Sequence, residues 1–301
     1  MKTIGGQAVI EGVMMRSAHA WTVAVRGPNK EVFVKKEIVP ELPKLLKKPV
    51  IRGVVALAQA LALGMKALFY SSEKSMPHGE KKPSSFSMGL TVFIAFILSI
   101  VFFLLFPLYA TKLLGIMFKT VNENSLAFNL ADGVIRITVF LLYLVSISIS
   151  KDISRVFQYH GAEHKVIYAY EAGIEMTPEN VGRYSILHPR CGTSFLLIVM
   201  VMSILMFSFI PQSWTFTGKF LSRVVLIPLI AGLSYEFVKF SSKKIDNPFI
   251  KILIAPGLSL QRLTAKVPTS DQIEVAIIAL KEVLLMESQY AVTERDKNNA
   301  D

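Results

Sequence analysis

Cysteine and charged residues are both scarce in this sequence of 301 residues. The single cysteine, Cys191, cannot form a disulfide within the chain, so nothing in it requires an oxidising compartment. Only 18% of the residues are charged, whereas 52% are hydrophobic, and the mean hydropathy is +0.48. A soluble core cannot bury that much apolar surface, which indicates a membrane protein.

Acidic residues are fewer than basic ones, 22 against 33, and the formal net charge is +11. Such an excess can mark a nucleic-acid partner. Here the basic residues are spread over segments that flank apolar runs and form no dense stripe, so we expect membrane lipid as a partner and no nucleic acid. The composition leaves the substrate unknown and leaves a homo-oligomer open.

Four apolar runs are long enough to cross a hydrocarbon layer, which takes roughly 20 helical residues. These runs cover residues 86–110, 133–150, 195–212 and 224–240. A fifth stretch, residues 50–70, contains Arg52, Gln59 and Lys66. Because these side chains are costly inside a bilayer, we expect an interfacial or re-entrant helix there and not a fifth span.

Lysine and arginine alternate between frequent and rare in the segments outside the four runs. Their counts are 14 in residues 1–85, 2 in 111–132, 5 in 151–194, 2 in 213–223 and 8 after residue 240. The N-terminus has no apolar core of a signal peptide. By the positive-inside rule we expect an inner-membrane protein with both termini and the loop 151–194 in the cytoplasm.

The expected fold class is mainly α, a polytopic helical membrane protein with about four transmembrane helices. Residues 21–26 and 31–39 alternate around Gly27-Pro28-Asn29 and predict a small cytoplasmic β-hairpin. An amphipathic helix should begin at Ser270 or Asp271. The expected divisions are the hairpin segment 1–49, the interfacial helix and linker 50–85, the transmembrane region 86–240 with its loop 151–194, and the cytoplasmic segment 241–301.

The loop 151–194 contains two groups of metal-ligand side chains. The first is His160-Gly-Ala-Glu163-His164, in which both histidines lie on one face of a helix and can reach one metal ion. This is the H-x-x-E-H pattern of inverted zinc peptidases, where the glutamate acts as a base. The competing interpretation is a pair of histidines on a helix surface.

The second group is His188-Pro-Arg190-Cys191, directly before the third apolar run. It supplies more ligands of the same kind, and the two groups stand at the two ends of one loop. A catalytic zinc usually has three protein ligands and a water, so His160, His164 and either Cys191 or His188 suffice. If all four residues bind, the site is closed and structural.

Other polar residues are weaker candidates. Glu171 and Glu175 are possible oxygen ligands within reach of the loop, although a solvated acidic loop is the favoured interpretation. Glu236 is expected to pair with Lys239 or Lys243, and Asp132 with Arg136. The N-terminal stretch Gly5-Gly6-Gln-Ala-Val-Ile-Glu11-Gly12-Val-Met-Met-Arg16 is either a turn before the hairpin or a segment packed on the site, with Arg16 available for an anionic substrate.

Three stretches together resemble the bacterial YqhQ-like family: GGQAVIEGVMMR at residues 5–16, YHGAEHKVIYAYEAG at 159–173 and HPRCGTSFLL at 188–197. That family is described as predicted metal-dependent enzymes of unknown function. The resemblance implies a membrane protein with a divalent metal, and its motifs coincide with His160, Glu163, His164, His188, Arg190 and Cys191.

Two hypotheses follow. In the first, the chain is a membrane-embedded hydrolase at the cytoplasmic surface, with zinc on His160, His164 and Cys191 or His188, Glu163 as the base and Arg190 stabilising negative charge. In the second, the same residues form a structural metal site in a non-enzymatic scaffold or assembly factor. Zinc is favoured among divalent metals because imidazole and thiolate are its preferred ligands.

The topology can be tested by labelling single cysteines. In a Cys191→Ala background, Glu179→Cys should react with a membrane-impermeant maleimide only after the cells are opened, because the counts of basic residues place the loop 151–194 inside. Labelling in intact cells would place the loop, and the metal-ligand side chains with it, on the outer side.

Overall fold

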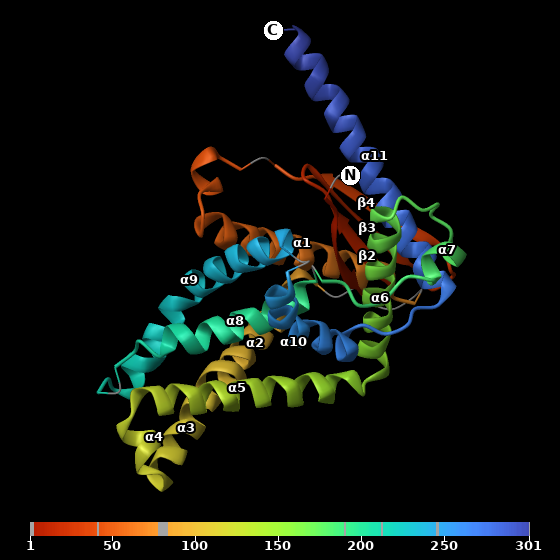
Figure 1. The fold of residues 1–301 in the computed structure, drawn as a ribbon. Helices are drawn as coiled ribbons and strands as arrows, with labels where there is room; N and C mark the ends of the chain where they lie inside the picture. Colours follow the sequence, from red (N-terminus) through yellow and green to blue (C-terminus); the bar gives the residue numbers. More distant parts are fainter. Residues whose placement is uncertain are drawn as a thin grey trace.

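The computed structural model describes residues 3–40, 42–77, 84–189, 191–211, 213–244 and 247–300. It contains a small sheet, helices that pack on both faces of this sheet, and a set of long apolar helices beside it (Figure 1). The chain is therefore mainly helical, as expected.

The sheet has four antiparallel strands in the order β1-β2-β3-β4. The predicted hairpin is confirmed by β3 (Ala20–Arg26) and β4 (Val32–Ile38). A second hairpin was not expected: β1 (Gly5–Val9) and β2 (Gly12–Arg16) pair across a tight turn in which Glu11 has a φ of 53°. The N-terminal motif is thus part of the sheet and not only a turn in front of it.

Alternating side chains give the sheet two apolar faces. Val13 and Met15 of β2 face α6 (Lys151–Glu171) and α11 (Ser270–Ala300). Met14, together with Trp21 of β3, faces the opposite way and packs with α1 (Ile51–Lys74). The expected amphipathic helix is α11, whose apolar side is buried on the sheet through residues that include Ile273, Ala276, Ile277, Leu280 and Val283.

Two helices, η1 (Lys44–Lys47) and α1, follow the sheet in the chain. Most of the helices that come after them are apolar. Their bounds are α2 (Ser85–Ile100), a π-helical turn (Val101–Leu105), α3 (Phe106–Met117), α4 (Lys119–Glu123), α5 (Ser125–Ser148), α7 (Pro178–Gly182), α8 (Gly192–Phe207), α9 (Phe216–Lys243) and α10 (Pro248–Thr264). The short helix α7 begins at a proline, with the preceding Thr177 as its cap. Helix α10 was not expected.

Among the described residues, four helices are long and apolar enough to cross a membrane: Ile51–Lys74, Phe86–Met117, Ser125–Ser148 and Phe216–Ser241. Their number agrees with the expectation, but their identity differs in two places. Helix α8, expected as a span, has only 16 residues, and α1, expected at the interface, is long enough to span.

The contacts of α1 are those of a helix lying beside the sheet. Gln59 accepts a hydrogen bond of 2.9 Å from Arg16, and Lys66 lies 3.7 Å from Glu37 of β4. Near the start of α1, Arg52 pairs with Glu236 of α9 through a hydrogen bond from Nε to Oε1 of 2.7 Å. Glu236 was expected to interact with Lys239 or Lys243. Lys239 does contribute an electrostatic interaction, but the pairing with the distant Arg52 was not expected.

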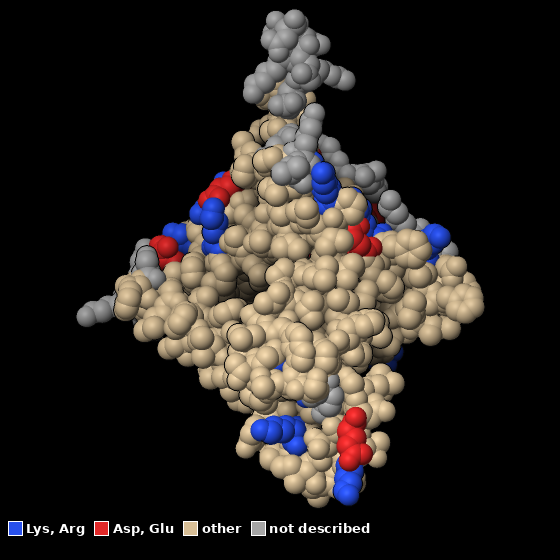
Figure 2. Space-filling model, turned by 90° about the vertical axis from the view of Figure 1, so that its left-hand side faces the viewer, with Lys and Arg blue, Asp and Glu red and all other residues tan. Residues whose placement is uncertain are grey.

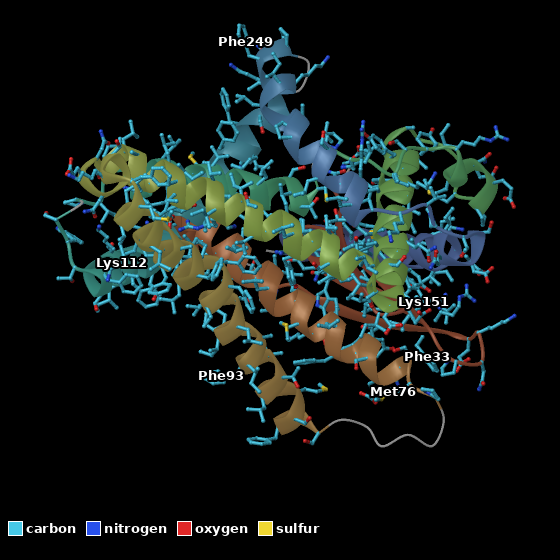
Figure 3. All side chains as sticks on the ribbon, turned by 90° about the horizontal axis from the view of Figure 1, so that it is seen from below. Phe33, Met76, Phe93, Lys112, Lys151 and Phe249 are labelled. Atoms are coloured by element: carbon cyan, nitrogen blue, oxygen red, sulfur yellow. The ribbon has the colours of Figure 1, made fainter. Side chains whose placement is uncertain are left out.

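Helices α2 and α3 form one long apolar rod. Pro107 lacks an amide N–H and its ring crowds the preceding turn, which explains the π-helical turn directly before it. Most side chains of α2 are exposed, including Phe93, which projects away from the other helices (Figure 3). In the view of Figure 2 a broad belt without charged residues separates two charged regions, as expected for a surface in contact with lipid.

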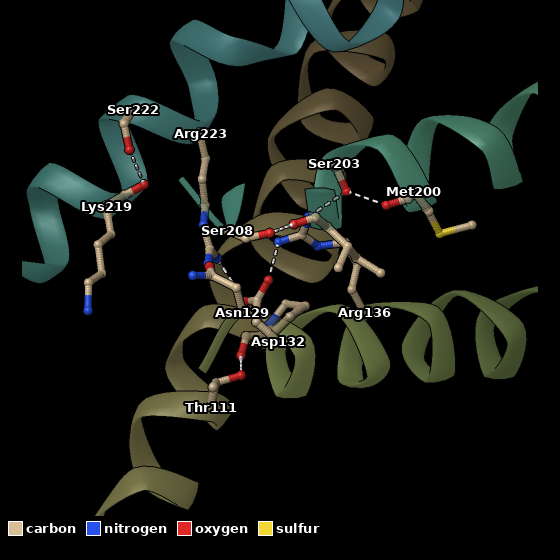
Figure 4. Close-up of polar contacts among 12 residues, drawn as sticks. Thr111, Asn129, Asp132, Arg136, Met200, Ser203, Ser208, Lys219, Ser222 and Arg223 are labelled. Atoms are coloured by element: carbon tan, nitrogen blue, oxygen red, sulfur yellow. Dashed lines mark hydrogen bonds and ion pairs between the residues drawn. The ribbon is translucent and has the colours of Figure 1, made fainter. Parts of the chain in front are cut away.

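A buried polar cluster connects α5, α8 and α9 (Figure 4). The expected pair of Asp132 and Arg136 is present at 2.7 Å, and Arg223 of α9 joins it with 2.7 Å to the other oxygen of the carboxylate. Ser203 and Asn129 accept further hydrogen bonds from the two guanidinium groups. Charged groups inside a bilayer are tolerated only when paired in this way, so the cluster fixes how the three helices pack.

This cluster predicts the effect of removing its carboxylate. Asp132→Ala should destabilise the protein by about 3–5 kcal/mol, because two buried guanidinium groups lose their counter-ion. Unfolding in mixed micelles of increasing SDS content would measure this. Glu123→Ala, at an exposed acidic residue of α4, is the control and should have little effect. Equal midpoints for both variants would contradict the role of the cluster.

Candidate metal centre

Helix α6 supplies the two histidines of the site. His160 and His164 are one turn apart on the same face, and their ring centroids lie 4.3 Å from each other. His164 is almost completely buried, with 1% of its surface exposed. The helix follows directly from α5, so the site lies where the long apolar helices meet the sheet and its covering helices.

Cys191 reaches the site from the start of α8. Its Sγ lies 3.1 Å from Nε2 of His160 and accepts a hydrogen bond from the backbone N–H of Thr193, which caps the helix. One ligand atom from each of His160, His164 and Cys191 lies within 4.8 Å of the others. The structure therefore brings together three residues that the sequence proposed as ligands.

Hydrogen bonds determine which nitrogen of each histidine can bind a metal. Nδ1 of His160 lies 2.7 Å from the carbonyl oxygen of Thr264, and Nδ1 of His164 contacts that of Ile186. A carbonyl oxygen only accepts, so both Nδ1 atoms carry the proton and both Nε2 atoms keep a lone pair. Within the described part of the chain, the buried Nε2 of His164 has no hydrogen-bond partner. Metal-binding histidines have this arrangement, so the residues fit a metal ion.

His188 occupies a different position from the one expected of a fourth ligand. Its Nε2 lies 3.7 Å from a carboxylate oxygen of Glu171, and its ring centroid lies 5.7 Å from that of His164. Burial, and then the proximity of His164, lower the pKa of His188 to about 4, so the ring is neutral at pH 7. Glu171 thus contacts His188, while Glu175 is exposed at the surface of the loop.

Glu163 lies beside these three side chains. Its carboxylate is 4.0 Å from Nε2 of His160, and only 6% of the residue is exposed. Burial raises the pKa of Glu163 to about 7, an effect that the neighbouring His160 partly offsets. Gly6 of β1 packs so closely that a Cβ there would lie 2.6 Å from Cγ of Glu163. Arg190, the other expected catalytic residue, lies outside the described residues.

A cavity of about 480 Å³ gives access to these side chains. It is lined by residues 3–8 in and before β1, by α6, by His188, and by Cys191 and the start of α8. The N-terminal motif therefore packs on the site, as one of the two hypotheses about it held. Arg16 does not line this cavity: it lines a second one, of about 600 Å³, on the α1 side of the sheet. Glu11 instead pairs with Arg155 of α6.

Two residues that hold the site were missed. Thr264 at the end of α10 accepts the hydrogen bond from His160. The fully buried Gln261 accepts a hydrogen bond of 2.8 Å from the backbone N–H of His188 and donates one of 2.8 Å to its carbonyl oxygen. The signal for α10 was present in Asn247-Pro248, a capping residue followed by proline at the first helical position.

Comparison with known proteins identifies the family. The model of the family DUF1385, described as "Protein of unknown function", matches residues 48–286. The chain is also 36% identical to the "Uncharacterized protein YqhQ" of Bacillus subtilis (strain 168) over 313 aligned positions, which cover 98% of this chain and 96% of that protein. The chain belongs to this family. No solved structure matches it. The resemblance to the YqhQ-like family is thus confirmed.

The geometry predicts different metal contents for two histidine variants. His164→Ala should lose the metal, because it removes one of three converging ligand atoms, whereas His188→Asn should retain it, because His188 is directed towards Glu171. Elemental analysis of the purified proteins, after dialysis against zinc, would measure this. Equal loss in the two variants would show that His188 is a ligand and that the site has four.

Proposed function

We propose that the chain is a metal-dependent hydrolase that acts at the cytoplasmic surface of the bacterial inner membrane. The residues that carry the proposal are His160, His164 and Cys191 as ligands and Glu163 as the general base. The single observation behind it is the convergence of three ligand atoms within 4.8 Å beside a buried carboxylate. The metal we propose is zinc, because two imidazoles and a thiolate are ligands of its preferred type.

The number of converging ligands favours a catalytic over a structural site. Structural zinc sites are usually closed by four protein ligands, whereas catalytic sites have three and an open position. His188, which would have been the fourth, is directed towards Glu171. The cavity of about 480 Å³ beside the ligands leaves room for a water and a substrate group.

Each part of the site has a separate role in the proposed reaction. His160, His164 and Cys191 would hold the zinc ion, which when bound would act as a Lewis acid and would lower the pKa of a water beside it to about 7. The carboxylate of Glu163 accepts the proton that the attacking water gives up, and returns it to the leaving group of the substrate. The backbone carbonyls of Thr264 and Ile186 hold the two imidazoles so that neither ring turns away during the reaction.

Glu163→Gln tests the catalytic role. The full-length protein in detergent, loaded with zinc, is incubated with a panel of fluorogenic peptide, carboxylic ester and phosphodiester probes. The variant should retain zinc but lose about 10²–10⁴-fold in the rate on the probe that the natural protein hydrolyses. Glu175→Gln, at an exposed acidic residue of the same loop, is the control and should hydrolyse normally.

Two outcomes would overturn the proposal. One is zinc-loaded natural protein that hydrolyses no member of the panel, and the other is equal activity of Glu163→Gln and the natural protein. If His164→Ala then also loses the fold together with the metal, the alternative of a scaffold with a structural metal site replaces the hydrolase.

A further inference from the structure

Within the part of the chain that the structure describes, the outer edge of β1 is unpaired beside the metal-ligand residues. β1 is the first strand in the sheet order, and the strand that it pairs with there is β2. Alternate residues of such a strand direct their N–H and C=O groups away from the sheet. Among the described residues, no backbone hydrogen bond joins Gly5–Val9 to any element other than β2. Exposed edges are usually blocked by charge, proline or a covering segment, and here Gly5, Gly6 and Gln7 are exposed.

Two glycines at this place have no packing contact, among the described residues, that would require a glycine. A Cβ added to Gly5 would meet no heavy atom within 4 Å, and the same holds for Gly192 at the start of α8. Both glycines line the cavity of the metal-ligand residues. Gly6 differs, because Glu163 packs against it. A glycine without internal contacts in a strand marks a place where another backbone approaches closely.

The two cavities meet at this edge. The cavity on the α6 side and the cavity on the α1 side share the lining residues Thr3, Gly5, Gly6 and Gln7. Open space therefore lies on both sides of the strand, where the alternating side chains of an added strand would project. The metal-ligand residues and Glu163 lie on one of these sides only, the α6 side.

We infer that the site takes a polypeptide in extended conformation, which adds as a fifth strand to the outer edge of β1. The inference rests on the proposed hydrolase and names its substrate class. Backbone hydrogen bonds to β1 hold the polypeptide, and pockets on the two sides accept its alternate side chains, which is a common mode of peptide recognition. One of its peptide bonds then faces the cavity that contains Glu163, His160 and Cys191.

A lipid fits the same observations less well. An apolar groove of about 560 Å³ lies between α8, α9 and α10 and could hold an acyl chain. It is lined by Ser194, Leu197 and Val201 of α8, whereas the metal cavity is lined by Gly192, Thr193 and Leu196, which lie on another side of the helix. Gly257 of α10 packs directly on Ser194, so an acyl chain in the groove does not lead to the metal-ligand residues.

Binding without turnover tests the inference separately from the proposed function. The probes are a hexapeptide of alternating valine and threonine with a C-terminal hydroxamate, and acetohydroxamate, which carries only the metal-binding group. The zinc-loaded natural protein should bind the peptide hydroxamate at least about 10-fold more tightly than acetohydroxamate. The peptide should also slow the hydrogen exchange of the amides of residues 4–8, with or without zinc.

Gly5→Leu provides the matched variant. Because the added side chain meets open space, it should leave the fold and the zinc content unchanged but weaken binding of the peptide hydroxamate by about 10-fold or more, with acetohydroxamate unaffected. Gly89→Leu in α2 is the control, since a Cβ there also meets no atom within 4 Å. If the zinc-loaded protein hydrolyses no member of the panel but binds the peptide hydroxamate as described, the hydrolase is excluded and the peptide-binding site is retained.

Three results would overturn the inference. The first is equal affinity for the two hydroxamates with no exchange protection of β1. The second is protection of the β1 amides by phosphatidylglycerol vesicles and not by the peptide, which would assign the edge to lipid. The third is protection that depends only on protein concentration, which would assign the edge to a second copy of the chain.

Discussion

The hydrogen bonds from two imidazoles to backbone carbonyls are the interactions on which the site depends. The carbonyl of Thr264 belongs to the end of α10, and that of Ile186 to the segment between α7 and α8. Three regions distant in sequence must therefore fold correctly before both Nε2 lone pairs converge. Lys165, next to His164, adds to this by donating a hydrogen bond of 2.6 Å to the carbonyl of Gly182. Helix α6 thus organises the segment that leads to Cys191.

Burial of polar and charged residues on α6 opposes folding. Glu163, His164 and Lys165 are consecutive and all buried. Lys165 donates hydrogen bonds to two backbone carbonyls, whereas Nε2 of His164 has no hydrogen-bond partner among the described residues. In the buried cluster of Asp132, Arg136 and Arg223, both carboxylate oxygens are paired and only the Nε atoms of the guanidinium groups lack a partner in the described part of the chain. An unpartnered imidazole nitrogen that faces a cavity is expected at a functional site, where stability is given up for chemistry.

Much of the architecture could be predicted because it follows from composition and period. Apolar runs of the length of a bilayer identified the long helices, and alternation around Gly27-Pro28-Asn29 identified β3 and β4. The spacing of four residues placed His160 and His164 on one face of a helix, as observed. These features depend on neighbouring residues only, so one stretch of sequence is enough to recognise each of them.

What could not be predicted depends on contacts between distant segments. The pairing of Arg52 with Glu236 joins α1 to α9, and the local alternative, a lysine one turn away, was the natural expectation from sequence. The orientation of His188 towards Glu171 depends on how Gln261 holds its backbone, which no spacing rule reveals. Likewise, Gly5 and Gly6 look alike in the sequence, and only the fold shows that one packs on Glu163 and the other faces open space.

The strand β1 shows both kinds of feature, because its short motif is visible in the sequence while its surroundings depend on the fold. A strand at the edge of a sheet is prone to pair with other chains, and most proteins protect such an edge. Here the edge is made of two glycines and a glutamine, and it borders the cavity that contains His160, His164 and Cys191. A larger side chain at Gly6 would displace Glu163, whereas one at Gly5 would only fill the cavity. The same short motif therefore meets two separate requirements: one glycine allows the carboxylate to approach the strand, and the other keeps the strand accessible to a second backbone.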